Sequence, residues 1–343
     1  MSAATPASPT VRGSSASTNA RRFLKRNAWL LALLVLLAVM LVFTKFIQPD
    51  YGPRAFVILV VAALPFAFAT AGQTMAIIAG GIDLSIAAMM ALISVTAASL
   101  MQGQSGEFGI VVVALVLAMG LGVGAINGIA VVFTRVPDIV VTLSFFFIWE
   151  GAALMVLDSP GGATTQWLRD LLTGTVGASF IPTGITDWIP KALILLVVGL
   201  GAVWIPLKLS RLGLGLYAIG SDKQAAFRSG VPVNRTKVAS YALAGLFASM
   251  GALALTMNTG NATPIQGPYL MASVAAVVLG GVSLAGGKGG FVGPIVAVFI
   301  LRLARQDLTF MQVDPNIAQV VEGLIMVSVV LVGAVVALRS KRS

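Results

Sequence analysis

Asp83 is the residue of this sequence whose type and setting could most readily do chemistry. It lies in residues 80–85 (Gly-Gly-Ile-Asp-Leu-Ser), a polar interruption between two apolar runs. Paired glycines break a helix, and a carboxylate inside a membrane needs a partner or a wet cavity. Because such interruptions mark the solute paths of transporters, we expect Asp83 to line one. The alternative is that its carboxylate holds the broken helix by accepting backbone N–H bonds.

Other polar side chains within apolar segments could join Asp83 along such a path. Amide and hydroxyl groups can bind a polar solute weakly enough to release it again. Hydroxyl groups, however, often bond the backbone of their own helix, an alternative that stays open for Ser85, Thr142 and Ser144. Asn127 lies among small residues and could equally join two helices. The residues predicted on the path are Asp83, Gln73, Ser85, Asn127, Thr142 and Ser283.

Residues 221–230 (Ser-Asp-Lys-Gln-Ala-Ala-Phe-Arg-Ser-Gly) indicate a second kind of chemistry, docking to another protein. Ser221 or Asp222 can cap a short helix, alanines favour it, and Gly230 before Pro232 ends it. The alternative is a basic loop that sets topology or touches anionic lipid, but such a loop would normally carry denser lysine and arginine. The residues assigned to docking are Ser221, Asp222, Lys223, Ala225, Ala226, Arg228 and Gly230.

The composition identifies the elements that must position these residues as membrane helices. Hydrophobic residues make up 58% of the chain and charged residues only 10%, so the sequence predicts an all-α polytopic membrane protein in contact with lipid. The chain has no Cys and no His, which argues against thiol, imidazole and most metal chemistry, and hence against an enzyme. The net charge of +10 sets orientation, because the basic residues flank apolar spans; nucleic acid is not expected as a partner.

Windows of about 20 apolar residues predict ten transmembrane helices, some of them broken by glycine. Basic residues before the first span place the N-terminus in the cytoplasm, and ten crossings return the C-terminus to the same side. The predicted spans are residues 28–47, 55–79, 83–101, 109–133, 139–157, 190–207, 237–257, 270–285, 290–305 and 317–338.

The same count assigns the segments outside the spans. Residues 1–27 read as a disordered basic tail and residues 339–343 as a cytoplasmic C-terminal tail, on either side of a transmembrane domain at 28–338. Residues 158–190 fall outside the cell and suit an external loop with an interfacial helix. Residues 209–237 fall on the cytoplasmic side, which is where the predicted docking helix would be needed.

Residues 80–85 have an echo in residues 280–285 (Gly-Gly-Val-Ser-Leu-Ala). Each segment follows one apolar run and precedes another. Interrupted segments at corresponding places in two halves suggest an internal repeat around a solute path. The alternative is that the paired glycines only let helices pack closely.

Three motifs occur in order along the chain. They are Gln-Thr-Met at residues 73–75 followed by residues 80–85, Gly-Leu-Tyr-Ala-Ile-Gly at 215–220 leading into residues 225–231, and the glycine-rich run at 275–289. Together they resemble the permease subunits of bacterial ribose-type sugar ABC transporters, over about residues 28–338. The resemblance assigns the family's coupling helix, which contacts the ATPase, to residues 221–231.

The resemblance also implies a set of partners and a location. A ten-helix permease of this kind would pair with a second copy or a related permease in the bacterial plasma membrane. Cytoplasmic ABC ATPase subunits and an extracytoplasmic sugar-binding protein would complete an importer of a monosaccharide or related polyol. No cofactor is expected in this chain, since the partner ATPase would bind the ATP.

Two departures from the family pattern bear on these expectations. The chain has Gly220-Ser221-Asp222 where the family usually has Gly-Gly-Asn, which still caps a helix. At residues 269–272 it has Tyr-Leu-Met-Ala where the family tends to show Glu-Leu-Asp-Ala. The loss of two acids removes strong acceptors for sugar hydroxyls, so the fold transfers from the family more readily than the substrate does.

An ion-coupled secondary transporter of a small polar solute is the alternative function. In that case Asp83, Glu150 or Glu322 would bind the coupling ion. The short basic docking helix argues against it, because an ion-driven carrier has no need of one. Residues 286–289 (Gly-Gly-Lys-Gly) lack the spacing and hydroxyl of a phosphate-binding loop, so ATP must be handled by a partner.

Overall fold

The computed structural model describes residues 27–177, 186–265, 267 and 269–340. Within them the chain forms helices joined by loops and no strand, only two isolated β-bridges, which agrees with the predicted all-α class. The helices are α2 (Ala28–Ile47), α3 (Pro53–Ile78), α4 (Ile86–Met101), α5 (Phe108–Thr134), α6 (Asp138–Val156), α7 (Gln166–Leu172), α9 (Lys191–Leu209), α10 (Arg211–Ser221), α11 (Lys223–Arg228), α12 (Val233–Thr259), α13 (Tyr269–Leu279), α14 (Val292–Phe310) and α15 (Pro315–Ser340).

Each of the ten predicted spans has a helix in the structure. Among the described residues, six helices are long and apolar enough to cross a membrane, namely α2, α3, α5, α6, α9 and α12. The helices α4 and α13 are shorter, with 16 and 11 residues, and each borders a glycine break. The remaining two predicted spans correspond to α14 and α15. Ten crossings therefore stay a prediction, while six rest on the length and composition of the helices.

The centre of the bundle is formed by α3, α4 and α12, with α5 packed closely on α12. Glycines make this packing possible, because a β-carbon on Gly245 would lie 2.0 Å from the carbonyl oxygen of Gly120. A β-carbon on Gly72 would likewise lie 2.8 Å from the carbonyl oxygen of Ala244. Small residues let helix backbones approach in the way that membrane proteins use in place of a hydrophobic driving force.

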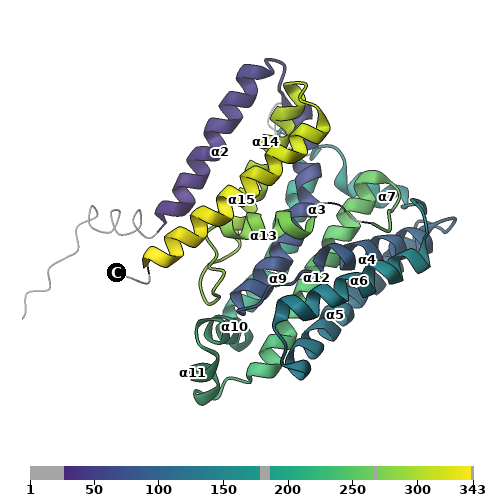
Figure 1. Ribbon diagram of the computed structural model, residues 1–343. Helices are drawn as coiled ribbons and strands as arrows, with labels where there is room; N and C mark the ends of the chain where they lie inside the picture. Colours follow the sequence, from purple (N-terminus) through teal and green to yellow (C-terminus); the bar gives the residue numbers. More distant parts are fainter. Residues whose placement is uncertain (1–26, 178–185, 266, 268, 341–343) are drawn as a thin grey trace, which may run out of the picture.

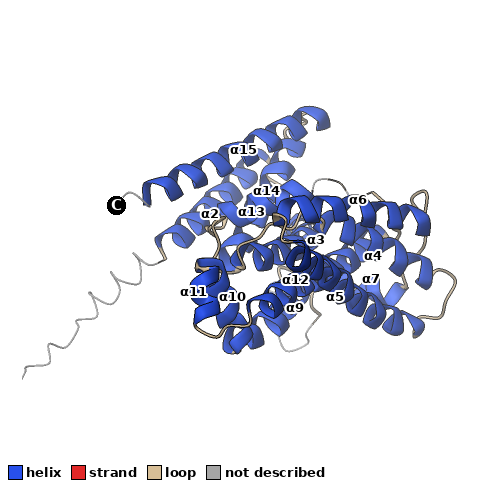
Figure 2. Cartoon of the chain, turned by 60° about the horizontal axis from the view of Figure 1, so that its bottom comes forward, coloured by secondary structure: helices blue, strands red, loops and turns tan. Residues whose placement is uncertain are grey.

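The remaining helices lie on two sides of this centre (Figure 1). One group contains α2, α13, α14 and α15, and the other contains α5 and α6. The view in Figure 2 shows the same separation. The short helices α10 and α11 lie at one end of the bundle, and α7 lies toward the other. We call these the α11 end and the α7 end.

The two glycine breaks share one backbone geometry. Gly80 has φ 74° and Gly281 has φ 82°, the left-handed region that glycine adopts without strain. The N–H of Gly81 bonds the carbonyl of Ala76 at 2.9 Å, and the N–H of Val282 bonds the carbonyl of Val277 at 3.2 Å. Both breaks are thus Schellman-type helix ends. By backbone geometry Gly80 corresponds to Gly281, whereas the sequence echo aligned Gly80 with Gly280. The two alignments differ by one residue.

Both breaks lie at the α11 end. The carbonyl of Ile78 accepts a 3.0 Å hydrogen bond from the N–H of Gly287, so the first break touches the loop of the second directly. At the α7 end, the indole of Trp167 donates to the carbonyl of Gly106 at 2.6 Å. The segments predicted to be cytoplasmic (209–237) and external (158–190) thus lie toward opposite ends of the bundle, and the side of the membrane on which each lies stays a prediction.

Two features differ from the sequence prediction or lie outside the described residues. Residues 209–237 were expected to hold one short helix, but they hold α10 and α11 and the start of α12. Ser210 caps α10 by accepting from the N–H of Gly213 at 3.1 Å. The sequence did not predict α10 because glycines in this helix lower its helix propensity. The predicted tails, residues 1–26 and 341–343, and part of the 158–190 loop, residues 178–185, lie outside the described residues.

Candidate functional site

The helix α11, predicted to dock a partner, forms with the cap that its sequence predicts. Of the two candidate caps it is Asp222 that acts, because its Oδ1 accepts from the N–H groups of Gln224 at 2.8 Å and Ala225 at 2.9 Å. Gly230, with φ 80°, ends the helix in the predicted place. Ala226 is buried, while the other residues of 221–230 are exposed. The structure thus presents a short, ordered and largely uncovered helix.

Phe227 is the most prominent feature of that helix, and sequence reasoning missed its importance. Its side chain is 72% exposed. Two grooves flank it, one of about 530 Å³ and one of about 250 Å³. An exposed aromatic side chain beside Lys223 and Arg228 is typical of an anchor in a protein interface. An aromatic residue within a short basic helix was the available sequence signal.

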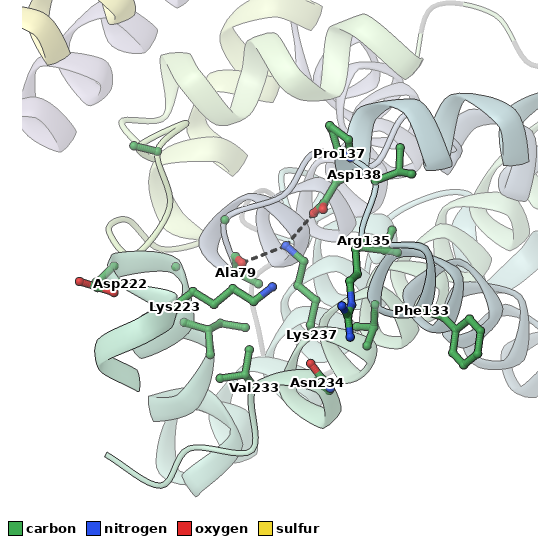
Figure 3. Close-up of a pocket in the computed structure, with 18 residues that line it drawn as sticks. Ala79, Phe133, Arg135, Pro137, Asp138, Asp222, Lys223, Val233, Asn234 and Lys237 are labelled. Carbon is green, nitrogen blue, oxygen red and sulfur yellow. Dashed lines mark hydrogen bonds and ion pairs between the residues drawn. The ribbon is translucent and has the colours of Figure 1, made fainter. Parts of the chain in front are cut away.

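A cavity of about 990 Å³ opens beside α11 at the same end of the bundle (Figure 3). It lies between the end of α3, the α5–α6 turn, the α10–α11 junction and the first turns of α12. Lys223 extends across it toward Lys237, whereas the carboxylate of Asp222 points away. The charged and polar residues in its wall are Arg135, Asp138, Ser221, Asp222, Lys223, Asn234 and Lys237.

An ion pair closes the inner wall of this cavity. The Nζ of Lys237 lies 2.6 Å from Oδ2 of Asp138 and 3.2 Å from the carbonyl oxygen of Ala79 (Figure 3). The hydroxyl of Tyr241 donates to the same Asp138 oxygen at 2.8 Å. Asp138 is the first residue of α6 and Ala79 ends α3, so each charge also meets a helix terminus of opposite polarity. We call this contact the Lys237–Asp138 bridge.

The bridge rests directly on the first glycine break. A β-carbon on Gly81 would lie 2.0 Å from Oδ2 of Asp138, 2.6 Å from the Tyr241 hydroxyl and 2.8 Å from Nζ of Lys237. Glycine at this position is therefore needed for close approach. The bridge joins α3, α6 and α12 in one contact at the point where the chain turns into α4.

Three of the predicted path residues meet in a buried network behind the bridge. Oδ1 of Asp83 accepts from the Ser85 N–H at 2.9 Å and from the Ser85 hydroxyl at 2.6 Å. Nδ2 of Asn127 donates to that hydroxyl at 2.6 Å, and the indole of Trp149 donates to Oδ1 of Asn127 at 3.0 Å. Asp83, Ser85 and Asn127 are at most 1% exposed. The network ties the first break to α5 and α6.

The other predicted path residues lie elsewhere. The Thr142 hydroxyl accepts from the Leu84 N–H at 3.1 Å, so it holds the break against α6 as well as bonding its own helix. Gln73 is fully buried in α3, and neither atom of its amide has a hydrogen-bond partner. Ser283 lies in the α13–α14 loop, where its hydroxyl accepts from the Ala285 N–H at 3.3 Å. Their place on a path stays a prediction.

The helix α10 links the docking helix to both breaks. A β-carbon on Gly220 would lie 1.9 Å from the Ile78 carbonyl oxygen and 2.6 Å from the Gly287 nitrogen. The Tyr217 hydroxyl donates to the carbonyl of Gly289 at 2.8 Å. Burial raises the pKa of Tyr217 above its ordinary value. The helix α10, which leads into α11, thus contacts the segments at both breaks directly.

Comparison with known proteins decides the family. A family model described as "Branched-chain amino acid transport system / permease component" matches residues 54–330, which is more than half of the chain. The chain belongs to this family. The permease is accordingly a multi-pass membrane subunit of a bacterial ABC importer, and it is a transport component rather than an enzyme. The resemblance to ribose-type ABC permeases is confirmed at the level of the family.

Curated relatives extend over nearly the whole permease. It is 29% identical to the "Autoinducer 2 import system permease protein LsrD" of Escherichia coli (strain K12), over 333 residues that cover 92% of this chain and 95% of the relative. The protein of the same name from Shigella flexneri matches with the same identity and coverage. No solved structure matches the permease.

Proposed function

We propose that the permease forms the translocation pathway for a monosaccharide or related polyol, together with a second copy or a related permease. Separate ATPase subunits on α11 would drive it, and an extracytoplasmic sugar-binding protein would deliver the solute. The observation that carries the proposal is the exposed, capped helix α11, joined through Gly220 to both glycine breaks. An LsrD relative that imports autoinducer 2 supports a small polar solute over the amino acid in the family's description.

The arrangement suggests how transport would be coupled to ATP. The Lys237–Asp138 bridge and the buried Asp83 network hold α3, α5, α6 and α12 together beside α11. Movement of α10 would press on the backbone at Ile78 and Gly287, where no space remains for even a methyl group. Packed contacts of this kind switch between discrete arrangements instead of deforming gradually. The α11 end would therefore open when the ATPases pull α11 away.

The test is transport by the reconstituted complex. The permease would be placed in liposomes with an ABC ATPase and a sugar-binding protein of the same transporter, and uptake of radiolabelled D-ribose would be followed. Uptake that requires ATP inside and persists after ionophores collapse proton and sodium gradients is the expected result. Uptake that stops with the gradients at constant ATP would establish the ion-coupled alternative instead.

A further inference from the structure

Arg302 is a charged residue in the middle of α14 that the coupling machinery does not use. Its Cζ lies 5.2 Å from the ring centre of Phe66 and 5.7 Å from that of Tyr269. Its Nη2 is 3.5 Å from the Tyr269 hydroxyl, which is long for a hydrogen bond. The two rings are themselves in contact, with centres 6.3 Å apart. Arg302 is thus held by aromatic faces from α3 and α13.

The charge of Arg302 has no counter-charge in the described part of the chain. The ion pairs found there are Lys237–Asp138 and Arg305–Glu322. On α14 itself, Asp307 accepts from the Thr44 hydroxyl at 2.7 Å. The Nε of Arg302 is sealed from the surface and has no hydrogen-bond partner. An unpaired guanidinium among apolar helices is costly, so such residues normally mark a binding site or path.

Further unpartnered polar atoms lie on both sides of Arg302 along the contact between α3 and α14, which run antiparallel because Tyr51 before α3 meets Phe310 at the end of α14. Gln306 lies one turn from Arg302, and its Oε1 is buried without a partner. On α3, Thr70 and Gln73 follow Phe66 at helical positions i+4 and i+7, so all three share one face. Since Phe66 contacts Arg302, that face is turned toward α14. The Thr70 hydroxyl and both amide atoms of Gln73 also lack partners. We call Thr70, Gln73, Arg302 and Gln306 the α3–α14 stripe.

We infer that the α3–α14 stripe is a solute-binding site and that Arg302 makes it select a hydroxylated solute bearing a carboxylate or phosphate. The inference rests on the proposed transport function. A guanidinium binds either acidic group through two parallel hydrogen bonds. On either side of Arg302, the amides of Gln73 and Gln306 offer donors and acceptors for hydroxyl groups of a solute that moves along the stripe. Phe66 and Tyr269 supply apolar faces for the carbon skeleton.

The position of Arg302 distinguishes a solute from a lipid headgroup as the source of the acidic group. It is the eleventh of the 19 residues of α14, so it lies about 12 to 15 Å from either end of the helix. A hydrocarbon core about 30 Å thick would put the headgroups at those ends, beyond the reach of the side chain. A solute that moves along the helices can pass Arg302 itself.

The experiment measures solute binding to the purified permease alone, in phosphatidylcholine nanodiscs, by the shift in its unfolding temperature. The probes are D-ribose, its carboxylate analogue D-ribonate, and D-ribose 5-phosphate. We expect the two acidic probes to bind about tenfold or more tightly than ribose, since a charge-assisted pair is lost with the neutral sugar. Arg302→Gln should remove this preference, and Arg302→Lys should keep part of it. Arg305→Gln, on the same helix but paired with Glu322, is the matched control.

Two sets of results would overturn the inference. Equal affinity for the three probes, or a preference that survives Arg302→Gln, would remove Arg302 from solute selection. A dependence on phosphatidylglycerol, or a loss of dimerisation in Arg302→Gln without any acid preference in the unmutated protein, would reassign it to lipid or to a second copy. Should Arg302→Gln fail to fold, Gln306→Met must weaken all three probes about equally. Because no ATPase is present, failure here leaves the coupling proposal standing if uptake is still ATP-driven.

Discussion

Asp83 begins a chain of hydrogen bonds that runs through Ser85 and Asn127 to Trp149, and this sets what its substitution should do. Asp83→Ala removes the acceptor of two bonds and should lower the free energy of unfolding by about 2 kcal/mol and abolish uptake. Asp83→Asn keeps one acceptor oxygen and should retain part of both. Thermal unfolding and uptake of the reconstituted complex measure the two effects. Ser144→Ala is the control, since that hydroxyl bonds only its own helix. Normal transport by Asp83→Ala would exclude a role for Asp83 in transport.

The Lys237–Asp138 bridge predicts a non-additive pair of substitutions. Removing one partner leaves a poorly solvated charge, while removing both leaves none. Lys237→Met and Asp138→Asn should each destabilise the permease, and the double variant should recover about 1 to 3 kcal/mol of the summed loss. Chemical unfolding followed by tryptophan fluorescence measures the cycle. Strictly additive losses would mean that the bridge contributes nothing beyond its separate residues.

At the scale of elements, α11 depends on its glycine stop for the direction in which it leaves the bundle. Gly230 has φ 80°, a conformation that a β-branched residue strongly disfavours. Gly230→Val should therefore leave the permease folded but uncouple ATP hydrolysis from uptake. The matched control is Gly103→Val, because Gly103 has φ 70° in an open loop at the α7 end. If both variants show normal, solute-stimulated ATPase activity and uptake, α11 is not the docking element.

The contact of α10 with the breaks predicts a contrast between two glycines. Gly220→Ala would place a methyl group 1.9 Å from the Ile78 carbonyl oxygen, so it should destabilise the permease and impair coupling. Gly122→Ala, in α5 with open space around it, should instead stabilise its helix by about 1 kcal/mol. Unfolding temperatures of the two purified variants test the contrast, which fails if they shift in the same direction.

For the whole molecule, the topology is testable because the chain has no native cysteine. Ten crossings place Lys223 in the cytoplasm and Trp167 outside the cell. Single cysteines at these positions should respond oppositely to an impermeant thiol reagent applied to intact cells. We expect labelling at 167 and none at 223 until the cells are opened. Labelling of position 223 from outside would invalidate the ten-span arrangement and the docking of a cytoplasmic ATPase on α11.

Much of the architecture was predictable because it depends on residues that are close together in the sequence. Apolar runs determine where membrane helices form, and each of the ten predicted segments contains a helix in the structure. The Asp222 cap and the Gly230 stop involve residues only two to five positions apart, so the sequence of α11 is enough to define it. The helix α10 was missed for the opposite reason. Its glycines lower helix propensity, and packing of Gly220 on both breaks compensates for this in the folded molecule.

The sequence by itself thus determined the membrane class, the helical segments, the two glycine breaks and the short capped helix α11, since each depends on neighbours along the chain. Only the tertiary structure decided which polar groups meet. It paired Lys237 with Asp138, joined Ser85 to Asn127, and placed Arg302 against two aromatic rings. These residues are far apart in sequence, and their contacts depend on how closely glycine-lined helices pack. No local sequence pattern encodes the spacing between packed helices. That spacing decides whether polar side chains form a buried network or line an open path.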